Sequence, residues 1–109
     1  MNLGELIKIL EATGYPVAYS HFIATPGKSV PAPPYICILV DGSANLMADN
    51  KVYHKIDDAN IELYTTKKDL VAEAKLEQVL DDHDIPYDSY GTFIESENLF
   101  QKTYETRLI

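Results

Sequence analysis

The sequence has little cysteine, few basic residues and no long apolar run. Its single thiol, Cys37, cannot close an internal disulfide, which excludes a disulfide-stapled fold and fits synthesis in a reducing cytoplasm. No apolar run approaches the roughly 20 residues that cross a bilayer. The start of the chain also lacks the basic residues and apolar stretch of a signal peptide. We therefore expect no membrane contact.

Basic residues are outnumbered by acidic ones. Nine lysines and arginines face 17 acids, which gives a formal charge of −8. Such a charge raises the electrostatic cost of approaching phosphate backbones and excludes a general nucleic-acid binder. Hydrophobic residues make up 46% of the 109 positions, which is too many for a disordered chain. We expect one folded domain over residues 1–109.

Helical periodicity is present in two places. The first ten residues carry apolar side chains at helical spacing, and Asn2 with Glu5 resembles an N-cap and its partner three residues later. Gly14 is suited to end this helix. A second capped start at residues 66–69 precedes helical spacing that continues to about Asp82.

The other apolar segments favour strands. The run 35–40 is short and continuously apolar, which predicts a central strand buried on both faces. Residues 41–43 give a turn signal, and residues 59–64 alternate apolar and polar side chains. We expect strands at 17–23, 35–40, 59–64, 87–96 and 99–109, an exposed proline-rich loop at 24–34, and a hairpin arm at 45–56.

This order of elements predicts an α+β fold, with a mostly antiparallel β-sheet and two α-helices packed on one face. The last two strands should form an antiparallel pair. The sheet face away from the helices would be polar but weakly charged, suited to solvent or to a neighbouring subunit, and would present Tyr64, Gln101, Thr103, Glu105 and Arg107.

The expected hairpin arm supplies a candidate assembly interface. Leu46 and Met47 are adjacent, so in an extended strand they point to opposite faces and one of them lies outside the domain's own core. An apolar side chain on a protruding arm favours a partner. Packing of both side chains beneath the loop is the alternative. We predict an interface formed by Leu46, Met47, Val52 and Tyr53.

Candidate metal sites are weak. The cluster Asp81-Asp82-His83-Asp84 comes at a helix end, where consecutive side chains diverge and no second ligand cluster closes the coordination sphere. We interpret it as a solvated helix end. His21, His54 and Cys37 fall in three separate strand segments; convergence on a metal, or a thiol and imidazole pair, is the less favoured reading.

Catalytic and cofactor signatures are equally weak. Cys37 sits in an apolar strand and is best interpreted as a small core residue with a raised pKa. Pro26-Gly27-Lys28-Ser29 lacks the context of a phosphate-binding loop and is interpreted as a turn. We predict no enzyme activity, no cofactor and no metal.

Four segments carry a resemblance that covers nearly the whole chain: "GYPVAYSHF", "PPYICILVDGSANLMADNKVYHK", "ANIELYTTKKD" and "YGTFIESENLFQKTYE". They resemble a family of short proteins from the structural modules of long-tailed phages and prophages of Gram-positive bacteria. These segments are structural sequence and include no catalytic signature.

The resemblance implies a tail-completion or tail-terminator protein. Such proteins cap the head-proximal end of the tail tube as hexameric rings and join it to the head. The implied partners are other copies of the chain, the major tail protein and a head-completion protein, with DNA passing through without specific binding. The implied location is the virion, after synthesis in the bacterial host's cytoplasm.

Other classes of function remain open on the residues alone. A small protein-binding adaptor or regulatory domain, another minor head–tail connector, and a small-molecule-binding or enzymatic α+β domain are the alternatives.

Overall fold

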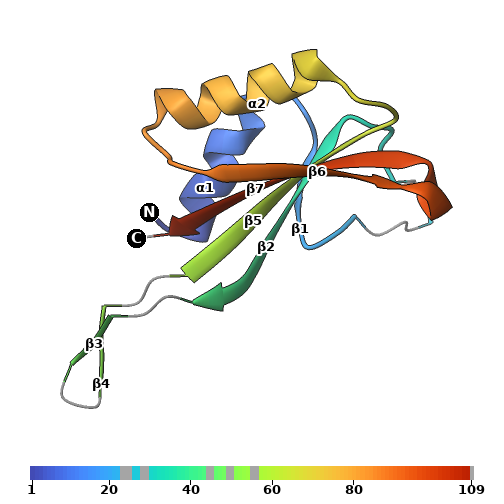
Figure 1. Cartoon of the computed structure of the whole chain (residues 1–109). Helices are drawn as coiled ribbons and strands as arrows, with labels where there is room; N and C mark the ends of the chain where they lie inside the picture. Colours follow the sequence, from blue (N-terminus) through green and yellow to red (C-terminus); the bar gives the residue numbers. More distant parts are fainter. Residues whose placement is uncertain (23–25, 28–29, 44–45, 49–50, 55–56, 109) are drawn as a thin grey trace.

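A computed structural model describes residues 1–22, 26–27, 30–43, 46–48, 51–54 and 57–108. Two helices and one sheet make up the body of the molecule, and a smaller hairpin projects from it (Figure 1). The elements are α1 (Leu3–Glu11), β1 (Val17–Tyr19), β2 (Tyr35–Ser43), β3 (Leu46–Ala48), β4 (Lys51–His54), β5 (Asp57–Thr65), α2 (Leu70–Asp82), β6 (Asp88–Ile94), a 3-10 turn (Glu95–Glu97) and β7 (Leu99–Leu108).

The sheet has five strands in the order β1-β2-β5-β7-β6. Only the β1–β2 pair is parallel; the β2–β5, β5–β7 and β6–β7 pairs are antiparallel. The predicted α+β class with a mostly antiparallel sheet is confirmed. The predicted pairing of the last two strands is also confirmed.

Both helices begin at the predicted caps. The side chain of Asn2 accepts a 2.8 Å hydrogen bond from the backbone N–H of Glu5, which starts α1. Gly14 follows the helix with φ of +86°, a conformation that glycine adopts without a Cβ penalty. Asp69 caps α2 by accepting from the N–H of Ala72 at 3.0 Å.

Predictions of strand extent were wrong in three places. One is the strand expected at 87–96, which ends at Ile94 because Glu95–Glu97 form a 3-10 turn. The strand expected at 17–23 ends at Tyr19, because Ser20 takes a left-handed φ of +66° and leaves the strand direction. Residue 23 and part of the loop expected at 24–34 lie outside the described residues. The turn expected at 41–43 is not a turn: β2 continues through Gly42 with a bulge after Val40.

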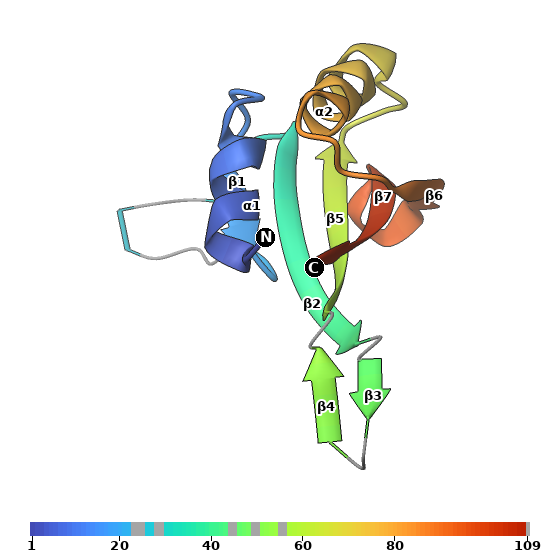
Figure 2. The same ribbon diagram turned by 90° about the vertical axis from the view of Figure 1, so that its left-hand side faces the viewer.

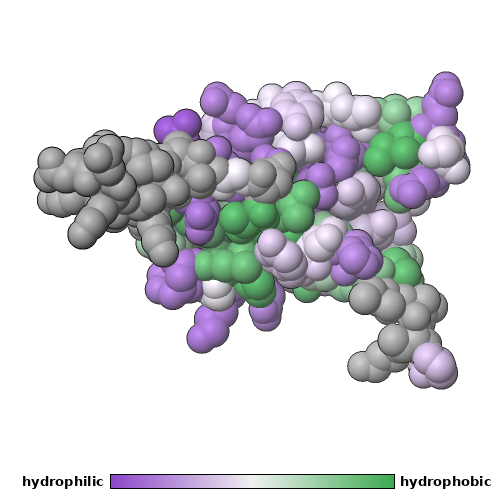
Figure 3. All heavy atoms as spheres, turned by 90° about the horizontal axis from the view of Figure 1, so that it is seen from below, coloured by the Kyte–Doolittle hydropathy of each residue, from purple (hydrophilic) through white to green (hydrophobic). Residues whose placement is uncertain are grey.

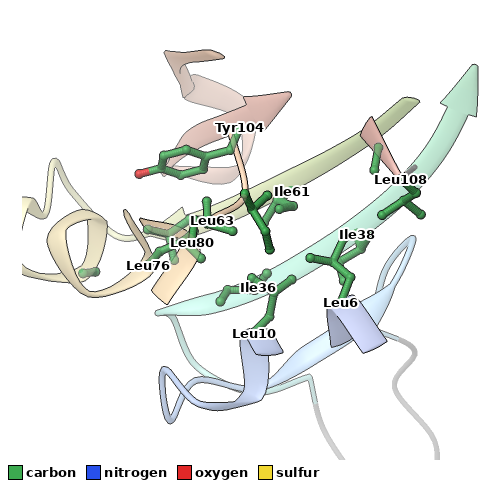
Figure 4. Packing of buried hydrophobic residues seen from close by; sticks show 13 residues of the cluster. Leu6, Leu10, Ile36, Ile38, Ile61, Leu63, Leu76, Leu80, Tyr104 and Leu108 are labelled. Carbon is green, nitrogen blue, oxygen red and sulfur yellow. The ribbon is translucent and has the colours of Figure 1, made fainter. Parts of the chain in front are cut away.

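The core is one cluster, to which both helices and one side of the central strands contribute side chains (Figure 4). The register sets Ile36 opposite Leu63 and Ile38 opposite Ile61, so these four side chains share a face. Figure 1 draws both helices above the sheet. The helices add leucines, and β7 adds Tyr104; these cluster members are Leu6, Leu10, Leu76, Leu80 and Tyr104.

Candidate assembly surface

The predicted interface residues lie together on a separate two-stranded sheet formed by β3 and β4. In its register, Leu46 is opposite His54 and Met47 is opposite Val52. Tyr53 lies between these two β4 positions. The predicted hairpin is therefore present, although residues 44–45, 49–50 and 55–56 lie outside the part of the chain that is described. We call β3 and β4 the arm.

The arm continues the two central strands of the sheet. The β2–β5 ladder runs past the bulge to the pairs Gly42 with Asp58 and Ser43 with Asp57, which are the last residues before the arm's connections. Figures 1 and 2 show the arm extending beyond the ends of β2 and β5. The last described residues before these connections, Ser43 and Asp57, thus belong to strands that also hold the core.

The sheet face away from the buried cluster, which we call the open face, carries a hydrogen-bonded group. Nε2 of Gln101 donates to Oε2 of Glu62 at 3.0 Å and to the hydroxyl of Tyr64 at 2.9 Å. That hydroxyl donates in turn to Oε1 of Glu62 at 3.2 Å. Burial, and then the neighbouring Glu62, raise the pKa of Tyr64. These hydrogen bonds link β5 to β7, and the raised pKa keeps the hydroxyl of Tyr64 protonated.

The other predicted open-face residues follow the same register. Thr103 pairs with Glu62, and Arg107 pairs with Asp58, so both side chains alternate away from Tyr104 and the core. Nε of Arg107 lies 3.2 Å from Oδ1 of Asp58. The predicted polar composition of β7 on this face is confirmed.

The open face is nevertheless not uniformly polar. Figure 3 views it from below and shows a hydrophobic group in the middle with hydrophilic residues around it. An aromatic row lies toward the other end from the arm: Phe22 meets Tyr35 edge-on at 5.3 Å between ring centroids, and Tyr35 stacks on Tyr64 at 5.2 Å. Sequence reasoning did not find this row, because it depends on the register of β2 with β5.

Cys37 is buried but lies on the open face. Its two neighbours, Ile36 and Ile38, point into the cluster, so its own side chain points the other way and pairs with Glu62 in the register. Only 3% of the residue is exposed. Burial, and then Glu62, raise the pKa of the thiol to about 11. The prediction of a packed core thiol with a raised pKa is confirmed, and the thiol lies on the side of β2 away from the main buried cluster.

A hollow of about 180 Å³ is lined by Cys37 together with His21 and Glu97. The nearest polar partner of the His21 ring is the hydroxyl of Ser20, at 3.1 Å from Nδ1. A thiol whose pKa is raised to about 11 is a weak nucleophile at neutral pH. The hollow therefore lacks the base-to-thiol hydrogen bond of a nucleophilic pair among the contacts that are described.

The acidic cluster after α2 forms local contacts. Nδ1 of His83 lies 2.9 Å from the carbonyl of Val79, and Asp82 accepts from Nε2 of Gln78 at 2.8 Å. Asp84 has φ of +54° and turns the chain away from the helix. In the described ranges, no three acidic, histidine or cysteine side chains lie close enough together to hold a metal ion.

Sequence reasoning missed two glutamates of α2 that face inward. Glu73 is buried, with Nζ of Lys68 at 2.8 Å from its Oε2 and Nζ of Lys102 at 3.5 Å from its Oε1. Glu77 accepts hydrogen bonds from the hydroxyls of Tyr104 and Tyr87. Glu73 occupies a helical position next to Ala72 and before Leu76, so spacing alone would have placed it on the buried stripe.

A large open hollow lies where β6 begins and β7 ends. It has a volume of about 920 Å³ and is lined by residues that include Asp84, Asp88 and Glu105. Thr106 borders it and donates from Oγ1 to the carbonyl of Pro86 at 2.6 Å. We call this the acidic hollow. No described helix is long and apolar enough to cross a membrane.

No protein-family model matches the chain, and no curated protein matches it significantly.

Proposed function

We propose that this protein is a structural component of a phage virion that completes the tail. In this proposal it caps the head-proximal end of the tail tube and joins it to the head, and it acts as a ring of identical subunits. Its partners would be the major tail protein and a head-completion protein. The resemblance of the four sequence segments to phage tail-completion proteins motivates the proposal.

The structural observation that carries most weight is the arm. A two-stranded sheet that extends beyond the five-stranded sheet is suited to reach a neighbouring subunit. Two-stranded hairpins are at best marginally stable alone in water, so a partner would stabilise this one. The arm therefore supports a role in assembly more directly than a role in chemistry.

The charge of the chain also fits a ring around DNA. A channel through which DNA slides must not hold the phosphate backbone, and a net charge of −8 disfavours such binding. A ring of these subunits would let DNA pass without a specific contact.

Electron microscopy of particles assembled without the protein tests this function. Filled heads beside uncapped or abnormally long tails are the expected result. Normal, infectious virions would overturn the proposal. Heads and tails of normal length that fail to join would instead indicate another minor head–tail connector.

Light scattering coupled to size-exclusion chromatography provides a second test. A ring-former is expected to show a discrete oligomer whose fraction grows with concentration. A monomer at every concentration would favour a protein-binding adaptor.

A further inference from the structure

Among the strands that the structure describes, the sheet has one long unpaired edge, the outer edge of β6. This strand is last in the sheet order and pairs only with β7. Its residues are exposed except for the half-buried Ile94, and Tyr90 and Phe93 are each 50% exposed. Because these two aromatic residues are three positions apart, they lie on opposite faces of the strand.

The β6 edge has little protection against strand addition, since Asp88 at its first position is its one charged residue. Edge strands of soluble proteins carry lysine, proline or a bulge, or are very short. The seven residues of β6 include no lysine, arginine or proline, and its register with β7 is continuous. The opposite edge strand, β1, has only three residues. The exposed backbone of β6 is thus available to another strand.

In the described part of the chain, the arm has unpaired strand edges to which another strand can add. Its two strands have three and four residues and pair only with each other among the described pairings. An extra strand on either side would add main-chain hydrogen bonds and cover one of its edges.

Charge also favours contact between the arm and the region of β6. Residues 44–56 contain two lysines and one histidine against one aspartate, in a chain of net charge −8. The acidic hollow starts at Asp88, the first residue of β6, and its lining carries four carboxylates against two cationic groups, the guanidinium of Arg107 and the amino group of Met1. Opposite charges on the two elements steer them together and set their orientation.

We propose that the arm of one copy adds as a β-strand to the β6 edge of a second copy, next to the acidic hollow. This inference rests on the self-assembly in the proposed function and names the two surfaces that meet. The arm extends β2 and β5, whereas β6 lies beyond β7 at the far edge, and Figures 1 and 2 show the two apart. Each copy therefore offers a donor and a separate acceptor. This is a heterologous contact, which forms a ring when the rotation between copies closes and an open filament when it does not.

Two variants with opposite defects test the contact. The arm variant, Met47→Asp with Tyr53→Asp, disables the donor and keeps β6 intact. The edge variant, Tyr90→Lys with Phe93→Lys, disables the acceptor and keeps the arm intact. A control for the edge variant, Leu70→Lys with Val71→Lys, puts the same two positive charges on α2, where these side chains are 69% and 72% exposed.

Native mass spectrometry and light scattering provide the readout. The wild-type chain and the control variant are expected to form the same oligomer. The arm variant alone and the edge variant alone are expected to remain monomers. A mixture of the two variants is expected to form a 1:1 dimer. The intact arm of the edge variant can bind the intact β6 edge of the arm variant, and no further contact of this kind is possible, so the dimer does not grow.

Each other result overturns the contact. An arm variant that assembles alone excludes the arm as donor, and an edge variant that assembles alone excludes β6 as acceptor; either result leaves the ring function standing. A mixture that stays monomeric shows that the two surfaces do not meet. A wild-type chain that never self-associates overturns this inference, while the particle microscopy judges the virion role separately.

Circular dichroism and thermal melting check that the variants fold. If either double variant loses the native spectrum, the single substitutions Met47→Asp and Tyr90→Lys replace it in the same mixing experiment. Met47→Asp still disables only the arm, and Tyr90→Lys still disables only the β6 edge.

Discussion

The hydroxyl of Tyr104 donates a 2.9 Å hydrogen bond to Oε2 of Glu77, which joins β7 to α2 at the buried side of the sheet. Tyr87 completes the group: its ring meets Tyr104 edge-on at 5.2 Å, and its hydroxyl lies 3.4 Å from Oε1 of Glu77. Burial, followed by the hydrogen bond to Glu77, raises the pKa of Tyr104. Helix α2 is thereby attached to the sheet by a polar contact as well as by leucines.

Removal of this hydroxyl should destabilise the fold. Tyr104→Phe keeps the ring but deprives Glu77 of its shorter donor, so the free energy of unfolding should fall by about 1 to 2 kcal/mol in urea titration. Tyr90→Phe is the matched control, because Tyr90 is half-exposed, and it should change stability by less than about 0.5 kcal/mol. Equal stability of Tyr104→Phe and wild type would contradict the prediction.

Lys102 should contribute more to the stability of the fold than a surface lysine does, because it lies next to the buried acid Glu73. Lys102→Met removes one of the two cations next to Glu73. The negative charge of Glu73, whose side chain is only 7% exposed, is then balanced by one cation instead of two. We expect a loss of about 1 to 3 kcal/mol in the free energy of unfolding, measured by urea titration.

Two further variants separate charge from packing at this site. Lys67→Met, at an exposed position between β5 and α2, should change stability by less than about 0.5 kcal/mol. Glu73→Leu combined with Lys102→Met removes both charges and should recover part of the loss. A double variant less stable than Lys102→Met alone would count against the electrostatic account.

Cys37 should be slow to react and sensitive to size. In the native protein a bulky disulfide reagent at pH 8 should label it far more slowly than in the urea-unfolded chain, since the thiol is buried and its pKa is about 11. Cys37→Ala should cost about 1 kcal/mol, and Cys37→Ser should cost more because a buried hydroxyl needs a partner. Labelling at the unfolded rate would show that the site opens readily.

Alkaline pH should destabilise the protein. The folded-state pKa of Cys37 is raised, so its contribution to stability is fully present below the ordinary thiol pKa of about 8.5 and is lost as the pH rises through about 11. Tyr64 and Tyr104 act in the same direction, starting from the ordinary phenol pKa of about 10.

Urea titrations between pH 7 and pH 11 measure this effect. The free energy of unfolding should be flat up to about pH 8.5 and then fall. Cys37→Ala should fall less steeply than the wild type over the first part of that range. A free energy of unfolding that rises with pH would contradict the sign of all three pKa shifts.

Gly91 should resist substitution for a local reason. A Cβ at this position would come within 2.7 Å of Cζ of Phe100, whose ring also lies 4.9 Å below Nζ of Lys68. Gly91→Ala therefore has to displace the ring or bend β6, and should lower the thermal melting temperature. Phe100→Leu combined with Gly91→Ala relieves the clash and should recover part of the loss; no recovery would place the strain elsewhere.

Local signals in the sequence were sufficient for the helices and the central strands. The capping side chains of Asn2 and Asp69 sit within three residues of the groups they bind, and the alternation in β5 needs only its own residues. A hairpin arm was expected over 45–56, but the position of its turn was not readable, because the turn signal at 41–43 falls inside β2.

Features that depend on register were not readable. The side of the sheet on which Cys37 lies follows from a pairing with β5, more than 20 residues away in sequence. The aromatic row on the open face and the ion pair between Glu73 and Lys102 have the same origin. The free edge of β6 follows from the strand order, which no local pattern specifies.

The way in which β2 and β5 lead into the arm has a mechanical consequence. Their ladder runs from the pair Tyr35 with Tyr64 to the pair Ser43 with Asp57, and the outer neighbours β1 and β7 lie alongside them. A pull applied to Ser43 and Asp57 along the direction of β2 and β5 therefore acts on both central strands. It loads their hydrogen bonds to β1 and β7 in shear, many at once, rather than peeling them apart one at a time. A subunit held by its arm would transmit tension into the middle of its own sheet, where it resists force best.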